Sequence, residues 1–218
     1  MLSDAITPIL LGALLGLRHA TDADHVVAVT TIVAREKSML RAARVGAVWG
    51  IGHSITLLVL GGAIIAFRLV IPPRVGLGLE FSVAVMLIGL GYANLRTRAE
   101  STEVRLSRPF LIGVVHGLAG SAAVALLVLA TIREPLAAAV YLTMFGLGTI
   151  LGMMTVTMLL AAPVRIAEAR VGSGQLGRMQ SGVRIAAGTL SIVLGVMIAR
   201  NLIVDGGLLS AMPTWDPH

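Results

Sequence analysis

The sequence predicts an all-α, polytopic membrane protein in which six transmembrane helices form two inverted three-helix repeats. Of its 218 residues, 56% are hydrophobic and only 13% are charged, whereas a soluble domain carries about 25% charged residues. Six stretches are long and apolar enough to cross a hydrocarbon core of about 30 Å, and the two halves of the chain resemble each other. This composition excludes a water-soluble domain and a nucleic-acid-binding module, in spite of a net charge of +6.

Each predicted span is a run of mainly apolar residues. The first run is too long for one straight span and has polar residues in its second half, so we expect it to be tilted, broken or partly interfacial. Aromatic residues are scarce, and Trp49, Tyr92 and Tyr141 are candidates for interfacial anchors. The predicted spans cover residues 5–33, 42–67, 76–95, 109–131, 135–162 and 183–204.

Basic residues lie in alternate loops. The loops after spans one, three and five hold twelve of the 17 basic residues, and the opposite side holds only Arg68, Arg74, Arg133 and Arg200. Cytoplasmic loops of membrane proteins are enriched in Lys and Arg. We therefore expect a multi-pass protein of the cytoplasmic membrane with both termini outside the cytoplasm.

The two halves match at an offset of about 97 residues. Gly16–Ala20 matches Gly113–Gly117, and Trp49–Gly52 matches Phe145–Gly148, while spans three and six share only Leu-Gly pairs. Because each half holds three spans, the halves must face opposite ways, as in secondary transporters whose site lies near the midplane. The alternative is chance similarity among Gly-rich apolar helices. We expect a single transmembrane domain at 1–218, with repeat one at 1–100 and repeat two at 101–218.

Ionisable side chains are concentrated in the first span, where residues 18–25 read Arg-His-Ala-Thr-Asp-Ala-Asp-His. Such groups are costly at membrane depth and are candidates for function. On a regular helix His19 and His25 would lie about 9 Å apart along the axis. Either the helix unwinds here or the two histidines serve successive sites. Alternatively, a short first helix ends here and leaves Asp22, Asp24 and His25 in the cytoplasmic interface.

Two more histidines, His53 and His116, lie near the middles of spans two and four, at the depth expected for His19. Their alternative role is a hydrogen bond that packs one helix against another. Together with the first-span cluster they give the candidate metal ligands, which are His19, Asp22, Asp24, His25, His53 and His116.

The available ligands select the kind of metal. Imidazole and carboxylate without thiolate suit Ni²⁺, Co²⁺ and Zn²⁺, and Mg²⁺ or Ca²⁺ would prefer oxygen ligands alone. The chain has no cysteine, which excludes disulfides, thiolate nucleophiles and Cys-ligated zinc. It also lacks the zinc-protease signature and the phosphate-binding loop. We therefore expect no enzyme, no catalytic residues and no permanently bound cofactor.

The string Arg18–His25, followed by Val26–Val29, resembles the signature of the nickel/cobalt transporter (NiCoT) family, RHA-x-DADH-[IV]. The His-x4-Asp-His core that this family requires for metal transport falls on His19, Asp24 and His25, and Gly52–Ser54 resembles its second motif. The long members carry an Asp-Thr-Ala-Thr-Glu type motif in a later span. Here the string from His116 to Ala122 is similar instead to the short, six-span relatives of urease-accessory type.

The resemblance implies a secondary transporter that moves nickel or cobalt, driven by a gradient, the membrane potential or a partner. Its expected partners are the divalent metal ion and the lipid bilayer, with a homo-oligomer or a metallochaperone contact as further expectations. The alternative is a proton-coupled small-ligand exporter, or a membrane accessory protein, in which the histidines relay protons. Bis-histidine haem ligation by two of His19, His53 and His116 is a further alternative.

Overall fold

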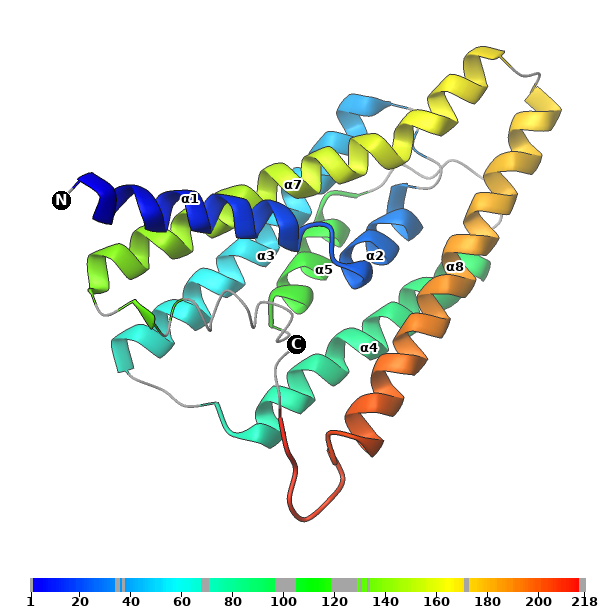
Figure 1. Cartoon of the computed structure of the whole chain (residues 1–218). Coiled ribbons are helices and arrows are strands. Elements are labelled where there is room, and N and C mark those ends of the chain that lie inside the picture. Colours follow the sequence, from blue (N-terminus) through cyan, green and yellow to red (C-terminus); the bar gives the residue numbers. More distant parts are fainter. Residues whose placement is uncertain are drawn as a thin grey trace.

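The computed structural model describes residues 2–33, 36, 38–67, 71–96, 105–118, 129, 131–132, 134–170 and 173–215, and the elements within these ranges are helical. The helices that it defines are α1 Leu2–His19, α2 Ala23–Val33, α3 Met39–Phe67, α4 Pro73–Arg96, α5 Ser107–Leu118, α7 Pro135–Arg170 and α8 Ser173–Val204 (Figure 1).

Four stretches are long and apolar enough to cross a membrane, and they lie in the predicted spans two, three, five and six. They are Met39–Phe67, Pro73–Arg96, Pro135–Ala167 and Gly177–Val204. The predicted first span is divided between two shorter apolar helices, α1 and α2. Helix α5 covers the first half of the predicted fourth span, and most of its second half lies outside the described residues. The described part of the chain is thus helical and has the composition of a membrane protein.

The outer faces of the helices are apolar. On α1, Ile6, Leu10 and Leu14 form an exposed stripe at a spacing of four residues, and Ile51 and Ile55 do the same on α3. Residues four apart lie on the same face of a helix. Such stripes are unfavourable in water but are compatible with lipid, so these faces are suited to contact acyl chains.

The helices form two groups. Helices α1, α3, α5 and α7 pack together, with α1 along α7 and α3 between α5 and α7, while α4 and α8 pair on the other side (Figure 1). Helix α2 contacts members of both groups. The main apolar core lies around it, where Val29 and Val33 meet Trp49, Leu87 and Met153.

The prediction of an interfacial anchor is wrong for two of the three aromatic residues. Trp49 and Tyr141 are fully buried in the protein and do not face a membrane surface. Trp49 is enclosed because α3 is packed by helices on several sides, and a bulky ring there fills the space between them. Tyr92, by contrast, is exposed near the end of α4, where the Arg96 guanidinium lies 4.7 Å from the centre of its ring.

The break between α1 and α2 has a local cause. The amide of Thr21 donates to the carbonyl of Arg18 and the amide of Asp22 to that of His19, which tightens the last turn of α1. The hydroxyl of Thr21 also donates to the Arg18 carbonyl. Thr and Asp offer the backbone such local partners and so favour helix ends. The chain then begins α2 with Asp24 in its first turn.

Candidate metal centre

The break between α1 and α2 brings His19 and His25 together. Their ring centres are 4.5 Å apart, half of the separation expected along a regular helix. The helix therefore unwinds here, which was one of the alternatives left open by the sequence. His25 is fully buried, so it is not an interfacial side chain at the end of a short first helix.

Four histidines from four helices meet at this point. His19 ends α1, His25 begins α2, His53 lies on α3 and His116 on α5. His19 is 5% exposed and the other three are fully buried. The ring centre of His25 lies 5.2 Å from that of His53 and 4.1 Å from that of His116. His19 Nε2 and His53 Nε2 are 3.1 Å apart.

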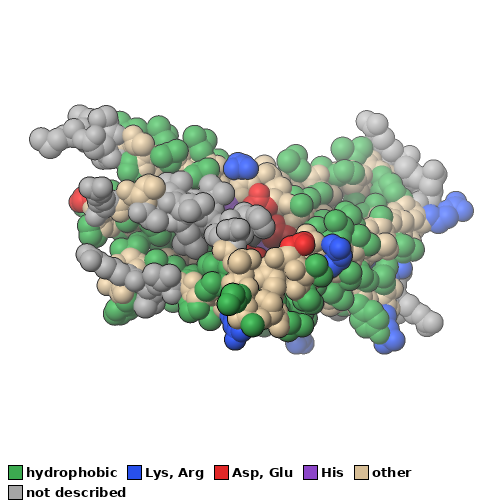
Figure 2. Space-filling model, turned by 60° about the horizontal axis from the view of Figure 1, so that its bottom comes forward, with side chains coloured by type: hydrophobic (Ala, Val, Ile, Leu, Met, Phe, Trp, Pro, Cys, Tyr) green, Lys and Arg blue, Asp and Glu red, His purple; other side chains and the backbone are tan. Residues whose placement is uncertain are grey.

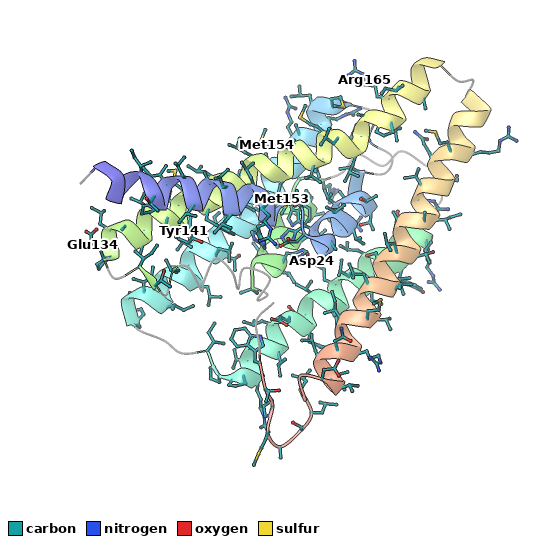
Figure 3. The ribbon with its side chains drawn as sticks, in the orientation of Figure 1. Asp24, Glu134, Tyr141, Met153, Met154 and Arg165 are labelled. Atoms are coloured by element: carbon teal, nitrogen blue, oxygen red, sulfur yellow. The ribbon has the colours of Figure 1, made fainter. Side chains whose placement is uncertain are left out.

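Asp24 connects two of these rings. Its Oδ1 lies 3.1 Å from His25 Nδ1, and its Oδ2 lies 2.8 Å from His116 Nε2. The side chain of Asp24 is 16% exposed and lies near the middle of the molecule, where α1, α2 and α5 approach one another (Figure 3). Asp22 lies further from the centre of the cluster. Its carboxylate contacts one ring, at 2.8 Å from His19 Nδ1, and its side chain is 39% exposed.

The sequence-predicted ligands therefore lie together in one cluster. Within it, two groups of three side chains can each offer ligand atoms within 4.8 Å of one another. One group is His19, His25 and His53, and the other is Asp24, His25 and His116. Asp22 belongs to neither group and orients the ring of His19 instead.

Several buried nitrogens of the cluster have no hydrogen-bond partner among the described residues, namely His25 Nε2, His53 Nδ1 and His116 Nδ1. Buried polar atoms are normally satisfied. In neutral rings, the N–H groups of His25 Nδ1 and His116 Nε2 donate to Asp24, and their second nitrogens then carry free lone pairs. An unprotonated imidazole nitrogen is the form that binds a metal.

Two large aromatic rings enclose the cluster. The Trp49 ring lies 5.7 Å from those of His25 and His116, and the Phe145 ring lies 5.4 Å from that of His19. Sequence reasoning missed Trp49 as part of this wall. Its position one helical turn before His53 was the available signal, because residues four apart share a face.

The cluster approaches the surface on one face. Figure 2 shows Asp and Glu side chains, with a little His surface, near the middle of a face that is otherwise largely apolar. Asp22 is partly exposed and Asp24 less so, whereas His25 is fully buried. The side of the cluster that carries the carboxylates is thus more exposed than the side that holds His25.

Fold and site together define a polytopic helical membrane protein with a buried cluster of histidines and carboxylates. Over 224 residues, the chain is 33% identical to the urease accessory protein UreH of Bacillus sp. (strain TB-90), covering 94% of this chain and 96% of that protein. The chain belongs to the family of this urease accessory protein. No family model and no solved structure matches it.

This membership confirms the urease-accessory part of the sequence-based resemblance. The relative is named as an accessory protein and not as an enzyme, in agreement with the expectation that this chain is not an enzyme.

Proposed function

We propose that this protein is a permease for a divalent first-row transition metal, nickel or cobalt, and that the buried histidine cluster is its transport site. One observation carries the proposal. Four histidines and Asp24 converge from α1, α2, α3 and α5 inside an apolar helical protein. Polar groups at such a place are expensive and mark ion or proton pathways.

The chemistry of the cluster and the family support the choice of metal. Imidazole nitrogens with one central carboxylate suit borderline divalent ions, and the lack of thiolates favours a site that releases its cargo. Urease is a nickel-dependent enzyme, so a relative that is an accessory protein of urease links this chain to nickel handling. The metal is the substrate here.

Helix packing supports two inverted repeats, the arrangement on which alternating access would depend. A Cβ atom at Gly16 of α1 would collide with the carbonyl of Phe145 on α7, and one at Gly113 of α5 would collide with the carbonyl of Trp49 on α3. In the alignment of the two halves, Gly16 corresponds to Gly113 at an offset of 97 residues, and Trp49 corresponds to Phe145 at an offset of 96. Each contact is thus the counterpart of the other under an exchange of the two halves.

The contact between α4 and α8 is also consistent with an exchange of the two halves, because each of its glycines packs against the counterpart of the other's neighbour. A Cβ atom at Gly91 would lie 2.8 Å from Ile192 Cγ1, and one at Gly188 would lie 2.9 Å from Leu95 Cγ. At an offset of 97 residues Gly91 corresponds to Gly188 and Leu95 to Ile192. A two-fold axis would pass through this crossing, as inverted-repeat transporters have.

The basic residues support an orientation with both termini outside the cytoplasm. Helix α8 begins at Ser173 and passes the end of α4 at Arg184, which donates to the carbonyls of Asn94 and Leu95. Helix α7 ends three residues before α8 begins. Positive charges gather at this end, and Lys and Arg are enriched on the cytoplasmic side. They include Arg41, Arg44, Arg96, Arg105, Arg108, Arg165, Arg178 and Arg184.

The test is uptake of ⁶³Ni²⁺ into proteoliposomes that contain the purified protein. His19→Ala and His25→Ala are expected to reduce uptake to that of empty liposomes. Ser191→Ala is the control, because it removes a buried hydrogen bond to the Leu87 carbonyl in the α4–α8 contact without touching the cluster. Uptake by both histidine variants at the rate of the wild type would overturn the proposal.

A proton relay is the second candidate function, and one observation favours it. Asp22, His19 and His53 form a chain of contacts of 2.8 Å and 3.1 Å, which is a suitable path for a proton. A relay predicts proton flux that depends on His19, persists in a metal chelator and occurs without metal uptake. A pH-sensitive dye inside the same proteoliposomes would detect it.

A further inference from the structure

We propose that the cluster holds its cation in turn at two overlapping sites that share His25. We call the ligands His19, His25 and His53 the imidazole site, and the ligands Asp24, His25 and His116 the carboxylate site. The ion passes between them by leaving one ring nitrogen of His25 and binding the other. This proposal rests on the proposed transport function and specifies how the same cluster carries out one transport step.

The ligand spacings of both sites fit one ion each. Two ligands about 2.1 Å from a metal are roughly 3.0 Å apart at a right angle and about 3.4 Å apart at a tetrahedral angle. His19 Nε2 and His53 Nε2 are 3.1 Å apart, and the two oxygens of Asp24 lie 3.1 Å and 2.8 Å from nitrogens of His25 and His116. Binding at the carboxylate site therefore needs small movements, and it also needs the protons of His25 Nδ1 and His116 Nε2 to move to the second nitrogens of the same rings, because only an unprotonated nitrogen binds a metal.

His25 is placed to serve both sites. Its ring centre is 4.5 Å from that of His19 and 4.1 Å from that of His116, whereas the rings of His53 and His116 are 6.1 Å apart. Its Nδ1 faces Asp24 of the carboxylate site. Its Nε2 is buried and has no partner among the described residues, so this nitrogen is left for the imidazole site.

The two sites hold one ion at a time. Two divalent cations bound around a single imidazole would repel each other strongly in surroundings of low dielectric constant. Asp24 is the carboxylate among the ligands of the two groups, so these ligands provide one negative charge in direct contact with the ion. We therefore expect one ion per chain, with tighter binding at the carboxylate site.

Movement of the proposed repeats would exchange the two sites. The imidazole site is built from helices α1, α2 and α3 of the first half, while the carboxylate site needs His116 of α5 in the second half. A displacement of the second half relative to the first therefore completes or breaks the carboxylate site and leaves the imidazole site intact. Alternating access would then couple the release of His116 to the transfer of the ion.

The experiment compares binding and transport in the full-length protein, purified with an affinity tag that contains no histidine. His53→Ala removes a ligand of the imidazole site, and His116→Ala one of the carboxylate site. Each single variant is expected to bind one Ni²⁺ per chain. His116→Ala leaves only the imidazole site and should weaken the affinity by about 10- to 100-fold, whereas His53→Ala leaves the tighter carboxylate site and should change the affinity little. The double variant and His25→Ala are expected to lose saturable binding, and both single variants to lose ⁶³Ni²⁺ transport.

A spectroscopic measurement identifies the remaining ligands. Nickel bound to His116→Ala should show the scattering of three imidazole rings in X-ray absorption, and nickel bound to His53→Ala that of two rings with an added carboxylate. Elution by size-exclusion chromatography and helical circular dichroism establish that each variant is folded. Ser191→Ala is again the matched control for loss of a buried polar group.

Some results would overturn the two-site proposal alone. If His53→Ala and His116→Ala each abolish binding as completely as His25→Ala, the cluster is a single site. If either variant transports nickel at the rate of the wild type, transfer between sites is not required, and two bound ions per chain would exclude single occupancy. A wild-type protein that binds no metal would overturn the proposed function itself.

Discussion

At the scale of the residue, Asp24 has a distinctive position in the cluster. Its two oxygens accept separate hydrogen bonds, one from His25 on its own helix and one from His116 on α5. The four histidines around it contribute no negative charge. A divalent cation in an apolar interior needs opposite charge close by. Asp24 therefore supplies the negative charge that stabilises the bound ion.

Replacing Asp24 tests this charge. Asp24→Asn preserves the shape of the side chain and removes its charge, and we expect the dissociation constant for Ni²⁺ to rise by about 10- to 100-fold. Equilibrium dialysis of the detergent-purified protein measures it. Asp205→Asn, at an exposed position after α8, is the matched control and should bind like the wild type. Equal affinity of the Asp24 and Asp205 variants would contradict this role.

Glycine positions give a residue-scale prediction about stability. Gly113 allows α5 to touch the backbone of α3, where a Cβ atom would collide with the Trp49 carbonyl. A Cβ atom at Gly62, by contrast, would have no heavy atom of the described residues within 4 Å outside its own turn of helix. We expect Gly113→Ala to destabilise the protein by about 1–3 kcal/mol, as overpacking does, and Gly62→Ala to leave it unchanged. Thermal unfolding in detergent measures both. Equal unfolding temperatures would show that the close approach of α3 and α5 is unimportant.

At the scale of the element, the break between α1 and α2 decides the geometry of the cluster. An unbroken helix would place His25 almost two turns from His19, but the three residues between the helices let both rings share one volume. Because both helices are short, their packing against α7, α8 and α3 must hold them in place. The site therefore depends on the register of α2 relative to α1.

A single inserted residue tests this register. One alanine inserted between Thr21 and Asp22 would rotate α2 by about 100° and shift it by about 1.5 Å if the register were carried into the helix. Asp24 and His25 would then leave the cluster, and we expect Ni²⁺ binding to be lost while helical content is retained. Thr21→Ala, which removes only the hydroxyl bond to Arg18, should bind normally. Normal binding by the insertion variant would contradict a role for this register.

The sequence predicted the long helices well, because apolar composition over some 20 residues determines whether a segment can span a bilayer. Helices α7 and α8 extend beyond the predicted spans, to Arg170 at the end of α7 and back to Ser173 at the start of α8. The added turns contain good helix formers such as Arg, Glu, Ala and Gln, so the helix continues past the apolar run. A hydropathy pattern reports the apolar run and not the end of the helix.

The site was predicted as a set of residues but not as an arrangement. Costly ionisable groups can be found in a sequence, which is why His19, Asp24 and His25 stood out. The pairing of Asp24 with His116 depends on how α2 and α5 pack, as does the enclosure of the rings by Trp49. Such contacts are set by the shapes of the helix surfaces in three dimensions. In the sequence, an isolated tryptophan in the first part of a predicted span resembles an interfacial anchor.

At the scale of the whole molecule, the proposed orientation follows from where the helices begin and end. Ser107 lies at the start of α5 between basic residues, and Ser210 lies beyond the end of α8, beside Arg74 at the opposite end. Both positions are exposed. The chain contains no cysteine, so a single introduced thiol can be labelled without background.

Labelling of intact cells with a membrane-impermeant maleimide tests this orientation. Ser210→Cys is expected to react, because the positive-inside rule places its end outside the cytoplasm, and Ser107→Cys is expected to react only after the cells are permeabilised. Retained ⁶³Ni²⁺ uptake would establish that both variants are correctly folded. The reverse labelling pattern would show that the protein has the opposite orientation in the membrane. The membrane potential would then favour cation movement in the opposite direction through the protein.

The central claim is that the buried histidines bind the transported metal directly. The most direct test is X-ray absorption at the nickel edge on the full-length protein, loaded with one equivalent of Ni²⁺ and purified without a histidine tag. We expect nitrogen and oxygen ligands at about 2.1 Å with the multiple scattering of imidazole rings, and loss of that scattering in His25→Ala. A spectrum of bound nickel with oxygen ligands and no imidazole, or a protein that retains no nickel, would contradict the claim.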